Sequence, residues 1–178
     1  MKKLPSIENS QKLLSSYIEN PALHHHCEMV AAAMQAYADK YEEDVELWYQ
    51  TGLLHDLDYE KYPDQHPTKG VNELLVSYPE ELKRAVLAHG PEITGVEPET
   101  RMERYLFACD EISGFLHAYA LMRPNGFDGM NTGKVIKKLG DLNFAAKISR
   151  NDIEKGFGLI PESPQEHLQF LIKTFSAI

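Results

Sequence analysis

Apolar residues recur at helical spacing along almost the whole chain, and the alternating patterns typical of strands are missing. For example, Leu82, Ala85, Val86 and His89 fall on one face of a helix. Pro, Gly and Asn interrupt this spacing at intervals, which divides the chain into successive helices. No repeat, low-complexity tract or long linker divides the 178 residues. These features predict an all-α protein, a single-domain irregular helical bundle over residues 1–178 with one hydrophobic core.

Residues that begin or end helices set the bounds of the predicted elements. Asp44 is a candidate N-cap, Pro79 suits a first helical turn, and Pro124 follows the longest helix. We expect loops at residues 57–67 and 91–98. The predicted helices cover residues 6–19, 24–40 after the Asn20-Pro21 break, 44–54, 68–77, 79–89, 98–122, 132–139, 149–155 and 163–175.

The composition is that of an ordinary globular protein, with 43% hydrophobic and 25% charged residues. The formal net charge of −9 argues against a surface that binds duplex nucleic acid or anionic lipid headgroups. Cys27 and Cys109 show no pattern that would indicate a disulfide framework. The first residues turn polar without an apolar leader, and no apolar run approaches the roughly 20 residues that cross a bilayer. We therefore expect a cytoplasmic protein.

The first candidate site residues are His55 and Asp56, which end the apolar run Gly52-Leu53-Leu54. An aspartate directly after a buried helical turn is unfavourable unless something compensates its charge. A divalent cation would compensate it, because such an ion accepts a neutral imidazole and a carboxylate together. The alternative is a histidine at a helix C-terminus followed by a solvated aspartate.

Asp110 and His26 lie far from this pair in the sequence, each within a predicted helix. Asp110 is in the middle of the longest one, where an isolated carboxylate is rare without a partner. The alternative for Asp110 is a salt bridge to Arg101 or Arg104. His26 lies on an Ala-rich helix, and its alternative is a surface cluster of the three histidines that begins at His24.

The order His26, His55-Asp56 and Asp110 resembles the H…HD…D signature of the HD-domain metal-dependent phosphohydrolase superfamily. The closer resemblance is to a bacterial subgroup of predicted HD hydrolases. It implies a helical fold of the HD-domain type and these four residues as metal ligands. The similar stretches are His26-Cys-Glu-Met-Val-Ala-Ala-Ala-Met34, Gly52-Leu-Leu-His-Asp-Leu-Asp-Tyr59, Asp110-Glu-Ile-Ser-Gly114 with Arg123-Pro124, and Lys137-Lys138 with Asn143-Phe-Ala-Ala146 and Arg150.

The resemblance covers about residues 20–175. Its signature region is at about residues 20–125, and we expect the C-terminal helices of residues 130–178 to pack on the same core. The subgroup has Lys-His at the first ligand, where this chain has His25-His26. The neighbouring apolar residues select His26, whereas a shift of one residue would select His25.

His66 and His89 extend the pattern to H…HD…H…H…D, which resembles the HD proteins that hold two metal ions. In those proteins the aspartate of the HD pair bridges both ions and the two further histidines complete the second site. The resemblance implies the same roles for Asp56, His66 and His89, although a lone histidine on an apolar helical face is more often a core residue. Mixed imidazole and carboxylate ligands suit Mn, Fe, Co, Ni or Zn better than Mg. We therefore expect one or two divalent transition-metal ions.

Such an ion would activate water for direct attack on a phosphate, since no nucleophilic Ser or Cys constellation is visible. Asp58 is a candidate to orient that water, and Lys69 is a second candidate catalytic residue. Basic side chains are candidates for binding the substrate phosphate, although most lysines are solvated surface groups. These candidates are Lys61, Lys69, Arg123, Lys137, Lys138 and Arg150.

Three functions follow from this pattern. The first is a phosphohydrolase that acts on a small phosphoester or nucleotide. The second is a two-iron oxygenase on the same scaffold, and the third is a non-catalytic module that senses a nucleotide or a metal. We expect a small phosphorylated substrate as the partner, rather than duplex nucleic acid or a membrane, and the sequence is compatible with a homo-oligomer.

Overall fold

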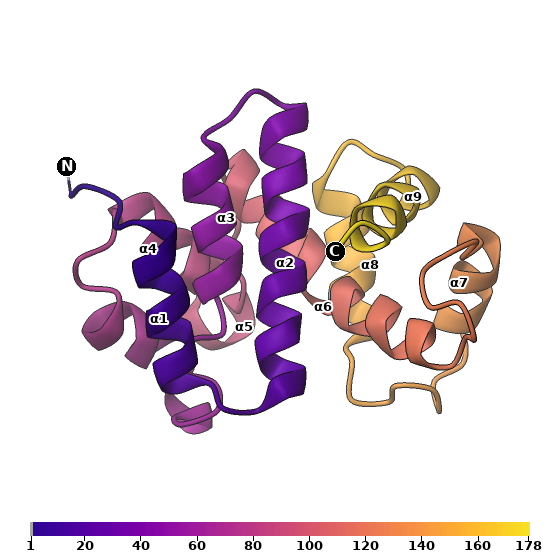
Figure 1. The fold of residues 1–178 in the computed structure, drawn as a ribbon, viewed down its shortest axis with the longest axis horizontal. Helices are drawn as coiled ribbons and strands as arrows, with labels where there is room; N and C mark the ends of the chain where they lie inside the picture. The colour runs from indigo at the N-terminus through magenta and orange to yellow at the C-terminus, as the bar shows by residue number, and fades with distance from the viewer. Residues whose placement is uncertain (1) are drawn as a thin grey trace.

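The computed structural model describes residues 2–178, and within them it contains helices and no strand (Figure 1). The predicted all-α bundle is therefore confirmed. No helix in residues 2–178 combines the length and the apolar character that crossing a membrane requires. The elements are α1 (Ile7–Tyr17), α2 (Pro21–Lys40), α3 (Val45–Leu54), the 3₁₀ helix η1 (Pro63–Gln65), the π-helix η2 (Gly70–Leu74), α4 (Glu80–Ala88), α5 (Pro91–Thr94), α6 (Arg101–Leu121), α7 (Thr132–Leu139), α8 (Arg150–Leu159) and α9 (Pro164–Phe175).

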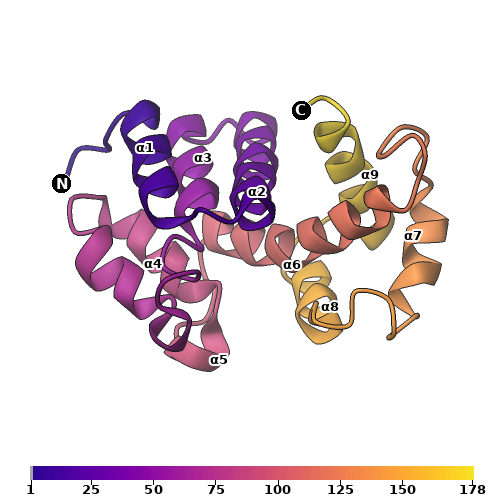
Figure 2. The ribbon, with the colours of Figure 1, turned by 60° about the horizontal axis from the view of Figure 1, so that its bottom comes forward.

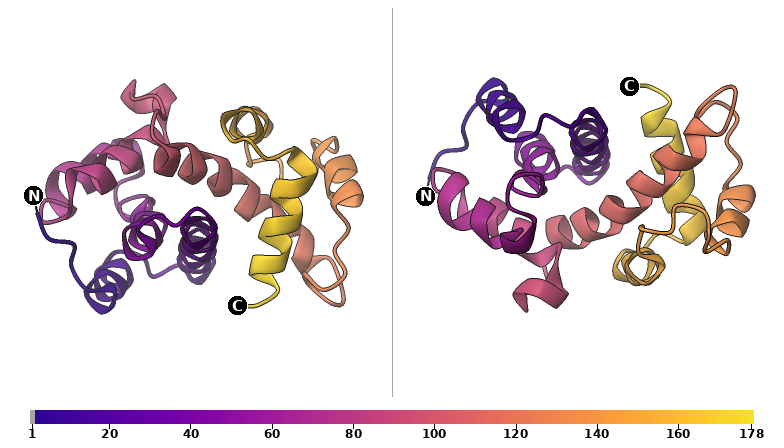
Figure 3. Two further views of the ribbon diagram at one scale, coloured as in Figure 1. Left: turned by 90° about the horizontal axis from the view of Figure 1, so that it is seen from above. Right: turned by 90° about the horizontal axis from the view of Figure 1, so that it is seen from below.

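The long helix α6 organises the bundle. It runs across the molecule, with α3, α4 and α5 near its N-terminal end and α7 and α9 near its C-terminal end (Figures 2 and 3). Helices α2 and α8 pack against it, and α2 also packs along α3. The middle of α6 therefore lies where α2 and the helices of both ends of the molecule meet.

Two clusters of buried apolar residues hold these helices together. One joins α2 and α6 to the C-terminal helices and includes Met34, Ile112 and Leu168. The other joins α1, α3 and α4 to the opposite face of α2 and includes Leu14 and Leu53. Because α2 contributes to both clusters, its position is fixed relative to both α3 and α6.

Helix caps explain where the sequence-based bounds hold and where they fail. Asp44 caps α3 as predicted, since its side chain accepts a hydrogen bond from the amide of Leu47. The predicted start of the long helix at Pro98 is wrong. Helix α6 begins at Arg101, because Thr100 and Glu103 form a reciprocal capping box that satisfies the first free amides.

Two predicted segments around the site differ in the structure. The helix predicted over residues 68–77 ends earlier and contains the π-helical turn η2. There the amide of Gly70 donates to the carboxylate of Asp58, 2.6 Å away, while the amide of Leu75 donates to the carbonyl of Gly70. The segment 91–98, predicted as a loop, begins with the single-turn helix α5.

Gly52 allows α3 to approach the backbone of α2 closely. A Cβ atom at this position would lie 2.8 Å from the Cα atom of Ala31 and 2.8 Å from the carbonyl oxygen of Val30. We expect Gly52→Ala to lower the free energy of unfolding by about 1–3 kcal/mol, because backbone atoms cannot yield to the added methyl group. Urea denaturation measures this change.

Gly158 in α8 provides the matched control, since a Cβ atom there would meet open space. We expect Gly158→Ala to leave the unfolding free energy unchanged or to raise it slightly, as alanine is the better helix former. Equal losses in the two variants would show that the contact between α2 and α3 is not the cause.

Candidate metal centre

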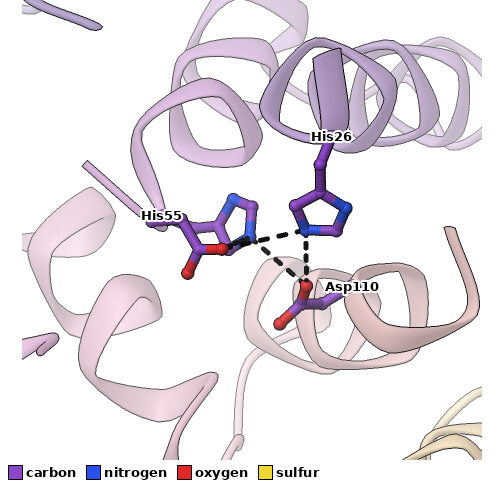
Figure 4. A group of neighbouring side chains, drawn as sticks. His26, His55 and Asp110 are labelled. Carbon is purple, nitrogen blue, oxygen red and sulfur yellow. Dashed lines mark hydrogen bonds and ion pairs between the residues drawn. The ribbon is translucent and has the colours of Figure 1, made fainter. Parts of the chain in front are cut away.

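Four side chains from three parts of the chain converge at the middle of α6. His26 comes from α2, His55 is the C-cap of α3 with Asp56 directly after it, and Asp110 comes from α6. The side chains of His26, His55 and Asp110 point toward one another (Figure 4). The Nε2 atoms of His26 and His55 lie 3.0 and 3.3 Å from Oδ1 of Asp110. One ligand atom from each of the four residues lies within 4.8 Å of the others, so the group could hold a metal ion.

A second group of ligands shares Asp56 with the first. Oδ2 of Asp56 lies 3.4 Å from Nε2 of His55, whereas its Oδ1 lies 3.4 Å from Nε2 of His66 and 3.6 Å from Nε2 of His89. Asp56, His66 and His89 also place one ligand atom each within 4.8 Å of the others. Each oxygen of Asp56 thus faces a different group, which is the arrangement of a carboxylate that can bridge two ions.

Three of the histidines are oriented by hydrogen bonds of their Nδ1 atoms, the ring nitrogens that face away from the centre. The Nδ1 atoms of His55 and His89 each donate to the carbonyl oxygen three residues earlier in the chain. Nδ1 of His66 lies 2.6 Å from a carboxylate oxygen of Asp58. These acceptors hold the hydrogen on Nδ1, so the neutral rings present the lone pair of Nε2 to the centre, as metal-binding histidines do.

The donor atoms of both groups fit a cation. Nε2 of His55 is fully buried and lacks a hydrogen-bond partner in residues 2–178. The Nε2 atoms of His66 and His89 face each other at 3.1 Å, although both carry lone pairs when Nδ1 holds the hydrogen. A positive ion beside these nitrogens would satisfy both arrangements.

The charges of the first group also favour a cation. Burial by itself lowers the pKa of His55, but the carboxylates of Asp56 and Asp110 raise it to about 10. Burial raises the pKa of Asp110, yet the imidazoles of His55 and His26 hold it well below its ordinary value. Without metal the carboxylates therefore retain a proton on His55, and a bound metal ion would take the place of that proton.

A pocket of about 360 Å³ opens onto both groups. Besides the ligands, its wall includes two carboxylates, one ammonium group and several apolar or small residues. The remaining lining residues are Tyr59, Gly90, Ile93, Glu111, Gly114, Lys147, Ile148 and Asp152. A larger cavity of about 890 Å³ lies beside Arg84 and Glu103 and contains none of the ligands, so it is unrelated to this chemistry.

The position of the first histidine ligand is now clear. His26 lies against Asp110, whereas the His25 ring contacts that of His117 in a tilted arrangement, with centroids 4.8 Å apart. The alternative salt bridge between Asp110 and Arg101 is wrong, because Arg101 pairs with Glu43 at 2.7 Å.

The structure does not bring Asp58, the predicted residue for orienting the attacking water, to the pocket. Asp58 is 1% exposed and does not line the pocket. Its Oδ1 binds His66 and its Oδ2 accepts from the amide of Gly70, so both oxygens are occupied. Asp58 instead positions His66 from behind the second group.

Lys69 and Lys61 are also outside the pocket. Lys69 forms an ion pair with Glu73 at 2.7 Å, one helical turn away. Lys61 donates to the carbonyl oxygen of Ser16 at 2.7 Å. The structure therefore does not bring these two predicted lysines to the ligands.

The four basic residues predicted from the C-terminal part do not line the pocket either. Arg123 donates to carbonyl oxygens of the turn after α6, and Lys138 pairs with Asp141 at 2.8 Å. Arg150 donates to several carbonyl oxygens of the segment before α8 and so holds that segment in shape. Lys137 is in the last turn of α7, away from the ligands.

Sequence reasoning missed three charged residues of the pocket wall, namely Lys147, Glu111 and Asp152. Glu111 follows Asp110, and its Oε2 accepts a hydrogen bond of 3.0 Å from the amide of Ser149, the N-cap of α8. Burial, with the charge of Asp110, raises the pKa of Glu111 to about 7. In the sequence, only Glu111 had a signal that could have identified it, namely its position next to Asp110. Lys147 reaches the pocket only through tertiary packing.

Comparison with known proteins gives one match. The family model described as HD domain matches residues 23–114, which is more than half of the chain and contains all six histidine and aspartate ligands of the two groups. No curated protein and no solved structure matches the chain.

Proposed function

The chain belongs to the HD domain family, and from this premise we propose that it hydrolyses a small phosphoester or nucleotide with the help of one or two divalent metal ions. The family consists largely of metal-dependent phosphohydrolases. The observation that carries the proposal is the pair of ligand groups that share Asp56 at the floor of one pocket.

Residues of both groups would hold the ions, which we expect to be Mn, Fe, Co, Ni or Zn. When bound, such an ion lowers the pKa of a coordinated water and polarises a phosphoryl oxygen. The side chains of the protein would orient the ligands and bind the phosphate. Its outer hydrogen bonds fix the orientation of the imidazoles, and Lys147 on the pocket wall offers the ammonium group that would bind a phosphate oxygen.

Phosphate release and metal content together test this function. We expect protein reconstituted with Mn or Co to contain one or two equivalents of metal and to release phosphate from part of a broad phosphoester panel. Metal content is measured by elemental analysis after gel filtration. A metal-loaded protein that releases no phosphate from any member of the panel would contradict the proposal.

Lys147 gives a prediction of its own. We expect Lys147→Gln to raise KM for phosphoesters about tenfold, because one charge-assisted hydrogen bond to the phosphate is lost. Steady-state kinetics measure this change. The matched control is Lys137→Gln, which removes an ammonium group outside the pocket and should leave KM unchanged. Equal effects of the two substitutions would remove Lys147 from the site.

A two-iron oxygenase is the second candidate, because the six ligands that could hold two ions also suit a pair of iron atoms. Anaerobic purification followed by iron analysis and electron spin resonance separates the two functions. A mixed-valence signal with no phosphate release would favour the oxygenase. A protein that binds nucleotide or metal but turns over nothing would be the non-catalytic sensor. The cytoplasmic location and a homo-oligomeric state stay predictions.

A further inference from the structure

The pocket wall beyond the metal ligands carries more negative than positive charge. Glu111 and Asp152 line it from α6 and from the first turn of α8, and Lys147 is its one cationic side chain. The amide of Ser149 donates to Glu111, which holds the beginning of α8 beside α6. Among the ion pairs of residues 2–178, none involves Glu111, Asp152 or Lys147. These three side chains are therefore available to a charged ligand.

The number of cationic side chains on the pocket wall limits the negative charge that the ligand can place against it. The other basic side chains expected around a phosphate are bound to carboxylates or carbonyl oxygens elsewhere, or point away from the pocket. Once one phosphate lies at the metal ligands, a nucleoside diphosphate or triphosphate would bring its further phosphates to a wall whose one ammonium group is that of Lys147. Its further charges would also meet two carboxylates, which repel them. The wall therefore favours a substrate with a single phosphate.

Glu111 and Asp152, two acidic side chains without a cationic partner, indicate what the rest of the substrate carries. A partly buried carboxylate gains most from a cationic hydrogen-bond donor, since charge-assisted hydrogen bonds are about twice as strong as neutral ones. We infer that the substrate is a small phosphomonoester whose alcohol part bears a cationic amine. This inference rests on the proposed function. The phosphate lies between the metal ligands and Lys147, and the ammonium group lies against Glu111 and Asp152.

The reaction requires only water. The oxygen of one water molecule bonds to phosphorus while the ester bond between phosphorus and the alcohol oxygen breaks. That alcohol oxygen takes up a proton released from the water. The products are inorganic phosphate and the free amino alcohol, and no atom is oxidised or reduced.

A pair of probes that differ only in the amine tests the inference. O-phosphoethanolamine has the amine, 2-hydroxyethyl phosphate has a hydroxyl group in its place, and ATP tests the exclusion of several phosphates. We expect kcat/KM for phosphoethanolamine to exceed that for 2-hydroxyethyl phosphate by about tenfold or more, with ATP the poorest of the three.

Variants of the two carboxylates assign the preference to the pocket wall. In the double variant E111Q/D152N we expect the tenfold ratio to fall to about one, mainly through a higher KM for the amine. The glutamine oxygen can still accept from the amide of Ser149, so the charge is removed while this contact with α8 is kept. Glu154→Gln is the matched control, because Glu154 is exposed on the same helix and does not line the pocket.

Two further measurements separate this inference from the proposed function. If the protein cleaves p-nitrophenyl phosphate but shows no preference for the amine, the inference is wrong and the proposed function stands. Calorimetric titration of the Mn-loaded protein with both small probes measures recognition without turnover. Tighter binding of phosphoethanolamine that the double variant loses would support the inference even if no phosphate is released, and equal binding of both probes would overturn it.

Discussion

We expect the His55→Ala variant to lose its bound metal and its phosphatase activity together. His55 is fully buried, and its Nε2 atom lies 3.3 and 3.4 Å from carboxylate oxygens of Asp110 and Asp56. Alanine removes the nitrogen donor and leaves two partly buried carboxylates beside each other with less compensation. The loss of activity should exceed the roughly 10- to 100-fold cost that is typical of losing an outer partner of a metal ligand.

Elemental analysis and hydrolysis of p-nitrophenyl phosphate measure both losses, and circular dichroism checks that the helices are retained. His25→Ala is the matched control, because His25 precedes the candidate ligand His26 but contacts the ring of His117 instead of facing Asp110. The control should keep its metal and its activity. Retention of full metal content or full activity in His55→Ala would refute the role of His55.

His167 should make the stability of the protein fall as the pH is lowered. It is buried between the hydroxyl of Tyr37, 2.6 Å from its Nδ1, and the carbonyl oxygen of Ala108, 3.0 Å from its Nε2. Burial lowers the pKa of His167 to about 4, although Ala108 and Glu162 oppose this change. In the unfolded chain the pKa of histidine is near 6.5, so below that pH the unfolded state gains a proton that the folded state does not bind.

The free energy of unfolding is therefore unaffected by His167 above about pH 6.5 and falls by about 1.4 kcal/mol per pH unit below it. The decrease ends near pH 4, after a total loss of about 3 kcal/mol. Urea denaturation of the protein and of the His167→Gln variant between pH 7.5 and 4 isolates this contribution. His55, whose pKa is raised, is present in both proteins and so affects both curves alike. Two curves that stay parallel over this range would show that His167 is not the cause.

Local patterns predicted most of the helices because their bounds depend on nearby residues. Helix α7 has the predicted bounds, Thr132–Leu139, and Asp44 and Ser163 cap α3 and α9 through their own side chains. The bounds failed where a side chain from elsewhere intervenes. Asp58 accepts from the amide of Gly70, the first residue of the π-helical turn that ends at Leu74, and helical spacing does not reveal this contact.

The residues that could hold a metal were predictable because the residue type and the order along the chain both point to them. A histidine-aspartate pair after a buried turn and an aspartate inside an apolar helix each need compensation. The structure brings them together on α2, α3 and α6.

The lysine of the pocket wall could not be predicted in the same way. The position of a lysine ammonium group depends on loop conformation and on neighbouring acceptors. The ammonium group of Lys61 donates to a carbonyl oxygen, and that of Lys69 pairs with Glu73. Lys147 lies between α7 and α8 and reaches the pocket because Arg150 and Glu111 hold that segment against α6. Only the three-dimensional arrangement identifies it.

A crystal structure of the protein soaked with Mn or Co, with anomalous diffraction recorded at the absorption edge of the metal, tests the central claim most directly. We predict an anomalous peak between Nε2 of His26, Nε2 of His55 and the carboxylates of Asp56 and Asp110, with a second peak beside His66 and His89 if two ions bind. A metal-bound crystal with its peaks elsewhere, for example at the partly exposed His25, and none between these four side chains would contradict it.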